Sequence, residues 1–343
     1  MRRASHLRAK KIDKANMDFQ KIKQDYKKSL KSMDTEEHFD LMFYRPMGYM
    51  WALLCAKLGV TPNAITIASI FLGVAGGILL YFGGQSGILI NLVGIFLIVW
   101  ANTFDSADGQ LARLTHQYSR IGRILDGLSG DFWFVAIYFA LVFREFDFGD
   151  SLVGDFFMNC HWLLWVLAVA AGVCHAKQAA SADYYRQFHL YFLKGEDGSE
   201  LDSTELDSTE QLDKANEQLS WSGDFWKKLT MLFYRNYTAN QEVITPNMQV
   251  LRRELHDRFG GAIPQAFRDA FRAKSLPLMK YTNMLSFNTR IIAMFVSVLI
   301  NMPWLYFAFE LVVLNAMLVY MIVRHEHICR NFVAELKQGK YAE

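Results

Sequence analysis

Four aspartates occur within 27 residues of one another and border long apolar stretches: Asp105, Asp108, Asp126 and Asp131. An ionised carboxylate at the edge of a membrane is costly unless it is paired or binds a cation. On a helix, Asp105 and Asp108 are neighbours at i and i+3, and Ala112 follows on the same face. If this face meets the helix that carries Asp126, carboxylate oxygens converge, and hard divalent cations prefer such ligands. The pattern therefore predicts a metal site.

Arg113 follows the first two acids at a spacing that suits phosphate binding, because its forked donors match phosphate oxygens. The alternative is that the acids form interfacial salt bridges with Arg113, Arg120 and Arg123. A lone aspartate at a helix end would favour that alternative. Four acids at this spacing favour the metal site.

The segment resembles the signature of the CDP-alcohol phosphotransferases, membrane enzymes that make phospholipids from CDP-activated substrates. The match runs Asp105-x-x-Asp108-Gly109-x-x-Ala112-Arg113, then Gly122 and Asp126, and Pro62-Asn63-x-x-Thr66 resembles the family's entry to its first spanning helix. The resemblance implies that Asp105, Asp108 and Asp126 bind Mg2+ or Mn2+. It also implies a set of nucleotide and phosphate contacts: Asn63, Thr66, Asp105, Gly109, Ala112, Arg113 and Gly122.

The last acid departs from the family pattern by one residue, since the expected position is Gly130 and the acid is Asp131. Five residues turn a helix by about 500°, so Asp131 would point roughly 140° away from Asp126. Either the acceptor is activated differently, or a bulge between Gly127 and Gly130 brings Asp131 back; we favour the bulge, because glycine tolerates the required backbone. Asp131 would then be a fourth metal ligand and the base that takes the proton of an acceptor hydroxyl.

The elements that must position these residues are apolar. Of 343 residues, 52% are hydrophobic and 20% charged, and the apolar ones gather in six blocks: Ala64 to Phe82, Ile88 to Phe104, Phe132 to Phe143, Phe156 to Val173, Ile291 to Trp304 and Leu305 to Val323. A helix needs roughly 20 such residues to cross a bilayer. The sequence therefore predicts an all-α polytopic membrane protein with six transmembrane helices, and it excludes disorder and a single soluble globule.

Charge and polarity divide the rest of the chain. We expect a basic arm (1–37), an amphipathic juxtamembrane helix (38–60), transmembrane helices 1–4 with the motif (61–194), a cytoplasmic insertion (195–280), transmembrane helices 5–6 (281–323) and a tail (324–343). Thr61 is the expected N-cap of the first spanning helix. Within the insertion, Phe225 to Tyr237 and Met248 to Phe259 have amphipathic helical spacing. The positive-inside rule places both termini and the carboxylates in the cytoplasm, and we expect the plasma membrane of a bacterium.

The expected activity is metal-dependent transfer of a substituted phosphate from a CDP-alcohol to an alcohol acceptor, with release of CMP. We favour CDP-diacylglycerol as donor and inositol phosphate or another polyol as acceptor, while transfer of a CDP-linked head group to diacylglycerol or ceramide stays open. Basic side chains suited to a phosphorylated acceptor lie near the ends of the fourth and fifth spanning helices: Lys177, Arg186, Lys280 and Arg290. The resemblance implies a homodimer, and no nucleic-acid partner is expected.

A cation or proton transporter is the rival of another class, since intramembrane aspartates also mark ion pathways. A transporter spreads polar groups along several helices through the bilayer. Here the acids cluster at one edge beside an arginine, which favours the enzyme.

Overall fold

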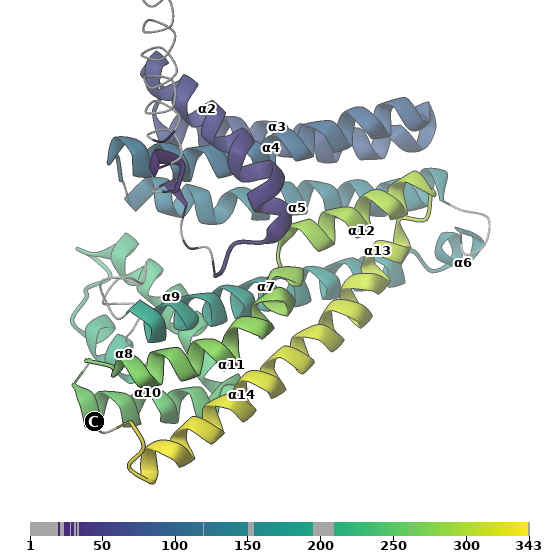
Figure 1. Cartoon of the computed structure of the whole chain (residues 1–343). Helices are drawn as coiled ribbons and strands as arrows, with labels where there is room; N and C mark the ends of the chain where they lie inside the picture. The colour runs from purple at the N-terminus through teal and green to yellow at the C-terminus, as the bar shows by residue number, and fades with distance from the viewer. Residues whose placement is uncertain are drawn as a thin grey trace, which may run out of the picture. The chain divides into compact units, whose positions relative to one another are not determined.

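The computed structural model describes residues 20, 24–27, 29–30, 32, 34–118, 120–149, 154–194, 209–260 and 262–341 (Figure 1). None of these residues forms a strand. Among them, six helices are long and apolar enough to cross a membrane: Pro62–Ser86, Ile88–Thr115, Leu125–Phe148, His161–Leu193, Gln265–Leu299 and Trp304–Lys337. The expected all-α polytopic architecture is confirmed.

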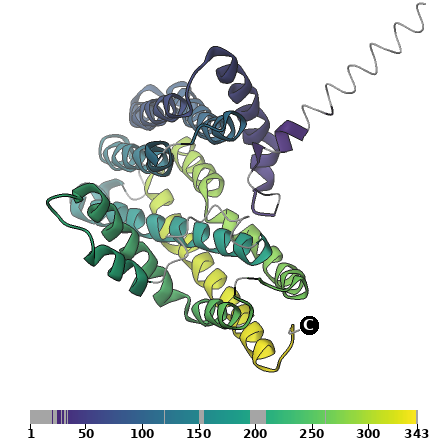
Figure 2. The ribbon, with the colours of Figure 1, turned by 90° about the vertical axis from the view of Figure 1, so that its left-hand side faces the viewer.

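The chain divides into two compact units, of which the first comprises Met1–Ala168 and Met294–Tyr306. Its helices include η1 (Asp40–Tyr44), α2 (Arg45–Leu58), α3 (Pro62–Ser86), α4 (Ile88–Thr115), α5 (Arg120–Phe148) and α6 (Gly154–Asn159). The side chain of Thr61 accepts a hydrogen bond from Ala64 N, and Pro62 occupies the first turn of α3, which confirms the expected N-cap. Helices α3, α4 and α5 lie side by side, as two perpendicular views show (Figures 1 and 2).

Glycines let these helices approach closely. A Cβ added to Gly73 of α3 would lie 2.2 Å from Cδ1 of Trp133 on α5, and one added to Gly76 would lie 2.8 Å from the carbonyl oxygen of Gly94 on α4. Small residues serve this purpose in membranes, where helix association depends on close van der Waals packing. The α3 face that contains these glycines therefore sets the spacing of α4 and α5.

Arg144 ties the same helices together near the end of α5. Its Nη1 donates to Leu80 O of α3 and to Asn91 Oδ1 of α4, both at 2.6 Å. Its Nη2 donates to Val298 O at 3.0 Å, and Nε and Nη2 both donate to Asn301 Oδ1. Every nitrogen of this buried guanidinium is hydrogen-bonded, so Arg144 acts as a structural cross-link.

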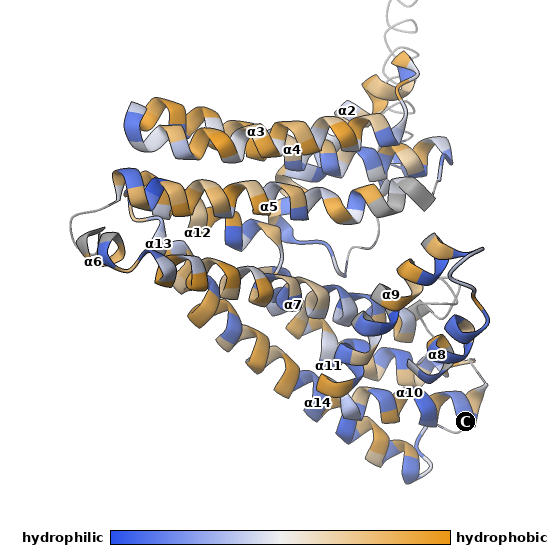
Figure 3. Ribbon diagram, turned by 180° about the vertical axis from the view of Figure 1, so that it is seen from behind, coloured by the Kyte–Doolittle hydropathy of each residue, from blue (hydrophilic) through white to orange (hydrophobic). Residues whose placement is uncertain are grey.

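The second unit comprises Val169–Ala293 and Phe307–Glu343. Its helices include most of α7 (His161–Lys194), then α8 (Thr209–Glu217), α9 (Phe225–Ile244), α10 (Pro246–Phe259), α11 (Gln265–Met284), the start of α12 (Phe287–Leu299), the end of α13 (Trp304–Ala308), η3 (Phe309–Leu314) and α14 (Asn315–Lys337). Helices α9 and α10 confirm the two amphipathic segments. Hydrophilic residues are frequent on α8 and α10, whereas apolar residues dominate α3 and α4 (Figure 3).

The fourth spanning helix differs from the expected one. The apolar block begins at Phe156, but the chain leaves the helix at Cys160, and the spanning helix starts at His161 and extends well past Val173. The amide of Cys160 is bonded to Phe156 O, while Cys160 O already accepts from Leu163 N. The apolar block therefore covers parts of both α6 and α7, and its composition gave no sign of the break at Cys160 between them.

The close contact at Gly73 yields a stability prediction. Gly73→Ala should lower the midpoint of thermal unfolding in detergent, because overpacking a tight contact costs about 1–3 kcal/mol and the new Cβ collides with Trp133. Gly172→Ala on α7 is the control, since its added Cβ would have no neighbour within 4 Å in the part of the chain that the structure describes. Equal unfolding midpoints for Gly73→Ala and the wild type would contradict the packing described for α3 and α5.

Candidate metal centre

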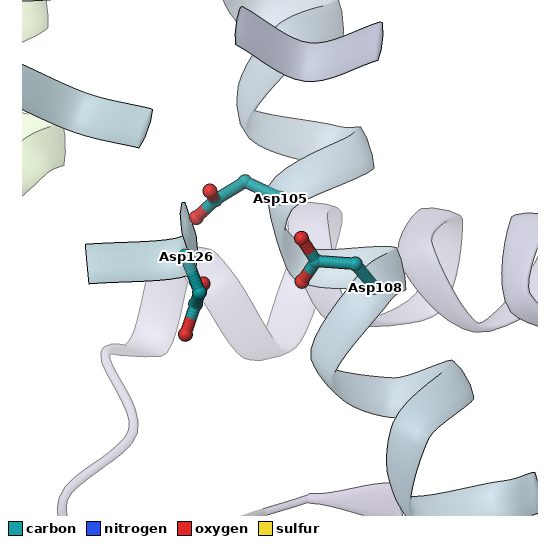
Figure 4. A group of neighbouring side chains, drawn as sticks. All are labelled: Asp105, Asp108 and Asp126. Carbon is teal, nitrogen blue, oxygen red and sulfur yellow. The ribbon is translucent and has the colours of Figure 1, made fainter. Parts of the chain in front are cut away.

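The structure brings three of the four aspartates together. Asp105 and Asp108 project from α4 toward Asp126 of α5 (Figure 4). One carboxylate oxygen from each lies within 4.8 Å of the other two. Asp108 is buried, Asp105 is half-buried and Asp126 is exposed, so the group is open on the side of α5. This arrangement of oxygen ligands suits a divalent cation.

Hydroxyl groups from two helices support the carboxylates. Thr66 Oγ1 of α3 donates to Asp108 Oδ2 at 2.5 Å. Ser129 Oγ of α5 lies 2.6 Å from Asp105 Oδ1 and donates to it. The other oxygen of Asp108, Oδ1, is buried and has no hydrogen-bond partner among the described residues. A buried carboxylate oxygen without a donor is costly, and a cation bound at this oxygen would remove that cost. The residues present therefore fit a metal ion.

Asp131 is not a member of the group. Helix α5 is α-helical throughout Arg120–Phe148, so the expected bulge between Gly127 and Gly130 does not form. No described residue lies within 4 Å of a Cβ added to either glycine, so none of them forces the backbone out of its regular hydrogen bonding. Asp131 instead shares a helix face with Tyr138, seven residues later, whose ring packs 5.9 Å from that of Tyr306.

The residues expected to bind the nucleotide lie around the same helix ends. Asn63 and Gly122 lie near the starts of α3 and α5, and Ala112 is half-buried on α4. A Cβ added to Gly109 would lie 3.5 Å from the Arg113 guanidinium, so these two residues are neighbours on α4. Their contacts with a nucleotide stay predictions.

Thr66 and Arg113, both candidates for nucleotide binding, have hydrogen bonds within the protein. Thr66 is bonded to Asp108, and Arg113 Nε donates to the backbone oxygen of Ser29 at 2.6 Å. Thr66 therefore supports a carboxylate directly, and Arg113 connects α4 to the segment that precedes the juxtamembrane helix.

The four residues expected to bind an acceptor belong to the second unit, in separate settings. Lys177 and Lys280 are exposed, and Lys280 Nζ lies 4.7 Å from the centre of the Tyr281 ring. Arg186 donates to Ser286 Oγ at 2.9 Å.

Arg290 has a different setting from the one expected, because it is buried and its donors are used within the protein. Nη1 binds both carboxylate oxygens of Glu310, Nη2 binds Gln178 Oε1, and Nε and Nη2 bind Leu285 O. A guanidinium with this many partners stabilises the fold and has no donor left for a substrate.

Sequence reasoning missed the partners of the carboxylate group. Ser129 lies three residues after Asp126, and this spacing on one helix face was the only local signal for it. Arg45 of α2 donates from Nη1 to Ser106 Oγ at 3.2 Å and from Nε to Glu36 Oε2 at 2.8 Å. Nothing in the local pattern around Arg45 indicates that it reaches α4.

Comparison with protein-family models matches residues 59–187 to the model described as CDP-alcohol phosphatidyltransferase. The matched span includes all four aspartates, Thr66 and Arg113. Comparisons with curated proteins and with solved structures gave no match.

The supporting hydroxyls give a prediction about metal affinity. Thr66→Val and Ser129→Ala should each weaken Mn2+ binding about 10- to 100-fold, as loss of hydrogen bonds to metal ligands commonly does, in a titration followed by electron paramagnetic resonance. Thr103→Val is the matched control, because the Thr103 hydroxyl donates to Val99 O of its own helix. Unchanged Mn2+ affinity in both variants would show that the hydroxyls do not hold the ligands in place.

Proposed function

The chain belongs, through residues 59–187, to the CDP-alcohol phosphatidyltransferase family of transferases for substituted phosphate groups, and from this premise we propose its substrates and mechanism. The donor is CDP-diacylglycerol, and the acceptor is a polyol or polyol phosphate such as inositol phosphate. The products are CMP and a new phosphodiester lipid. The cofactor is Mg2+ or Mn2+.

The observation that carries this proposal is the group formed by Asp105, Asp108 and Asp126 at the ends of spanning helices and inside the matched region. A divalent cation bound there would neutralise charge on the diphosphate and make CMP a better leaving group. Arg113, whose guanidinium lies next to Gly109, holds a phosphate through its forked donors.

In the proposed reaction, the acceptor hydroxyl oxygen forms a bond to the distal phosphorus of the CDP-alcohol. The bond between this phosphorus and the bridging oxygen breaks, and CMP leaves with the electron pair. Asp131 takes the proton of the hydroxyl.

The remaining proposals concern the surroundings of the enzyme. Lys177, Arg186 and Lys280 are the candidates for binding a phosphorylated acceptor. The protein is an integral membrane protein, and we place it in a bacterial plasma membrane as a homodimer with its termini and active site in the cytoplasm.

The substrates are tested by offering CDP-diacylglycerol and CDP-linked head groups separately to the purified protein and measuring CMP release with a panel of alcohols. CMP should appear with CDP-diacylglycerol and a polyol or polyol phosphate, stop in EDTA, and return on addition of Mg2+ or Mn2+. Asp105→Asn, Asp108→Asn and Asp126→Asn should each abolish it, because each removes a charged ligand. Turnover only with CDP-head groups and diacylglycerol or ceramide would reverse the donor assignment, and normal turnover in EDTA would exclude the metal site.

The base is tested separately. Asp131→Asn should lower turnover by about 100-fold or more with little change in affinity for the CDP substrate, because general-base catalysis typically contributes about 100- to 10,000-fold. Asp147→Asn is the control on the same helix, since this carboxylate accepts a hydrogen bond from Tyr81 at 2.7 Å and lies 16 residues further along α5. A wild-type rate for Asp131→Asn would remove Asp131 from the mechanism.

A further inference from the structure

One flank of α4 carries both an acid of the metal group and the phosphate-binding candidate. Asp105, Gly109 and Arg113 follow one another at four-residue intervals and form a single stripe along the helix. Ser106 is displaced by about 100° from Asp105, which brings it within roughly 20° of the direction of Arg113. Groups that contact Ser106 are therefore on the Arg113 side of the carboxylates.

Helix α2 crosses α4 at this flank. A Cβ added to Gly48 would lie 2.9 Å from Ser106 Oγ and 3.1 Å from Ala107 N, so the two helices are in close contact. Gln110 Nε2 donates to the backbone oxygen of Arg45 at 3.1 Å. This contact fixes the start of α2 against α4 and directs the Arg45 side chain to Ser106.

The hydrogen bonds of Arg45 are incomplete. Nε donates to Glu36 and Nη1 to Ser106, but Nη2 has no hydrogen bond to any residue that the structure describes. The two structural arginines, Arg144 and Arg290, use all three of their nitrogens. The Arg45 side chain also keeps 18% of its surface exposed. Arg45 therefore retains donors that a ligand can reach.

The charge of Arg45 is held in place. Burial by itself lowers the pKa of Arg45, but the carboxylates around it, Glu36 above all and also Asp40 and Asp105, outweigh burial and raise the pKa above its ordinary value. Glu36 is 4% exposed, and only its Oε2 is bonded, because Oε1 has no partner among the described residues. Glu36 thus orients the guanidinium through one contact and leaves its other side open.

We propose that Arg45 is a second phosphate-binding residue of this site, which together with Arg113 holds the diphosphate of the CDP-activated substrate, while Glu36 positions its guanidinium. The inference rests on the proposed function, since it takes the diphosphate from that substrate. Charge supports it: three carboxylates repel a diphosphate, and two guanidiniums on the flank next to Asp105 attract it. Arginine donors are well matched to phosphate oxygens.

The test measures binding of CDP to the detergent-purified protein by calorimetry in the presence of Mn2+. Arg45→Gln should weaken CDP binding about 10- to 100-fold, because a hydrogen bond to a charged group contributes about 1.5–3 kcal/mol. Arg45→Lys keeps the positive charge but loses the forked donors of the guanidinium. Its affinity for CDP should lie between those of the wild type and Arg45→Gln. Lys57→Gln is the matched control, as it removes an exposed positive charge from the last turn of the same helix.

A Mn2+ titration without nucleotide separates phosphate binding from a purely structural role. Arg45→Gln should keep wild-type affinity for Mn2+ alone, since Arg45 is not a ligand. If its Mn2+ affinity falls as much as its CDP affinity, Arg45 only arranges α4 and the inference is wrong. If Arg45→Gln does not purify in folded form, Arg45→Lys and Glu36→Gln carry the test, and both should lose several-fold in CDP affinity with Mn2+ binding intact.

The two proposals fail in different ways. A wild-type protein that binds Mn2+ but not CDP would contradict the proposed function. Equal affinity of the wild type and Arg45→Gln for CDP would show that Arg45 does not bind the diphosphate. That result would leave the proposed function standing.

Discussion

Mutual repulsion between three carboxylates is the constraint on which the site depends. Asp105, Asp108 and Asp126 place oxygens within 4.8 Å of one another beside apolar helices, where charges interact more strongly than in water. Thr66 and Ser129 each contribute a hydrogen bond to one of these carboxylates, but a neutral hydroxyl cannot offset a charge. A cation among the oxygens would stabilise such a group, and the buried oxygen of Asp108 that has no partner among the described residues could serve as one of its ligands.

Keeping the carboxylates together requires that α3, α4 and α5 have a fixed spacing. The glycines of α3 provide it, because the ring of Trp133 and the backbone at Gly94 occupy the space that larger side chains would take. Arg144 fixes the same three helices 18 residues, or about 27 Å, along α5 from Asp126. The packing of α3, α4 and α5 therefore determines both the positions of the three carboxylates and the hydrogen bonds of Arg144.

Properties that are local in the sequence could be predicted from it. Apolar blocks revealed six spanning helices, Thr61 and Pro62 marked a helix start, and the spacing of Asp105, Asp108 and Asp126 predicted that these carboxylates lie together. Contacts between distant segments could not be predicted, because they depend on how the helices pack. Ser129 on Asp105, Arg45 on Ser106 and the buried pair of Arg290 with Glu310 are of this kind. The bulge near Asp131 was inferred from a family pattern, whereas the helix keeps its regular hydrogen bonds.

We propose that side chains from α4 and α5 form one divalent cation site. Diffraction from crystals grown with Mn2+, measured on both sides of the manganese absorption edge, tests it most directly, because the anomalous difference locates the metal independently of any assumed ligand. An anomalous peak should lie within coordination distance of carboxylate oxygens of Asp105, Asp108 and Asp126. Carboxylates that pair only with arginines, with no peak between them at saturating Mn2+, would contradict it.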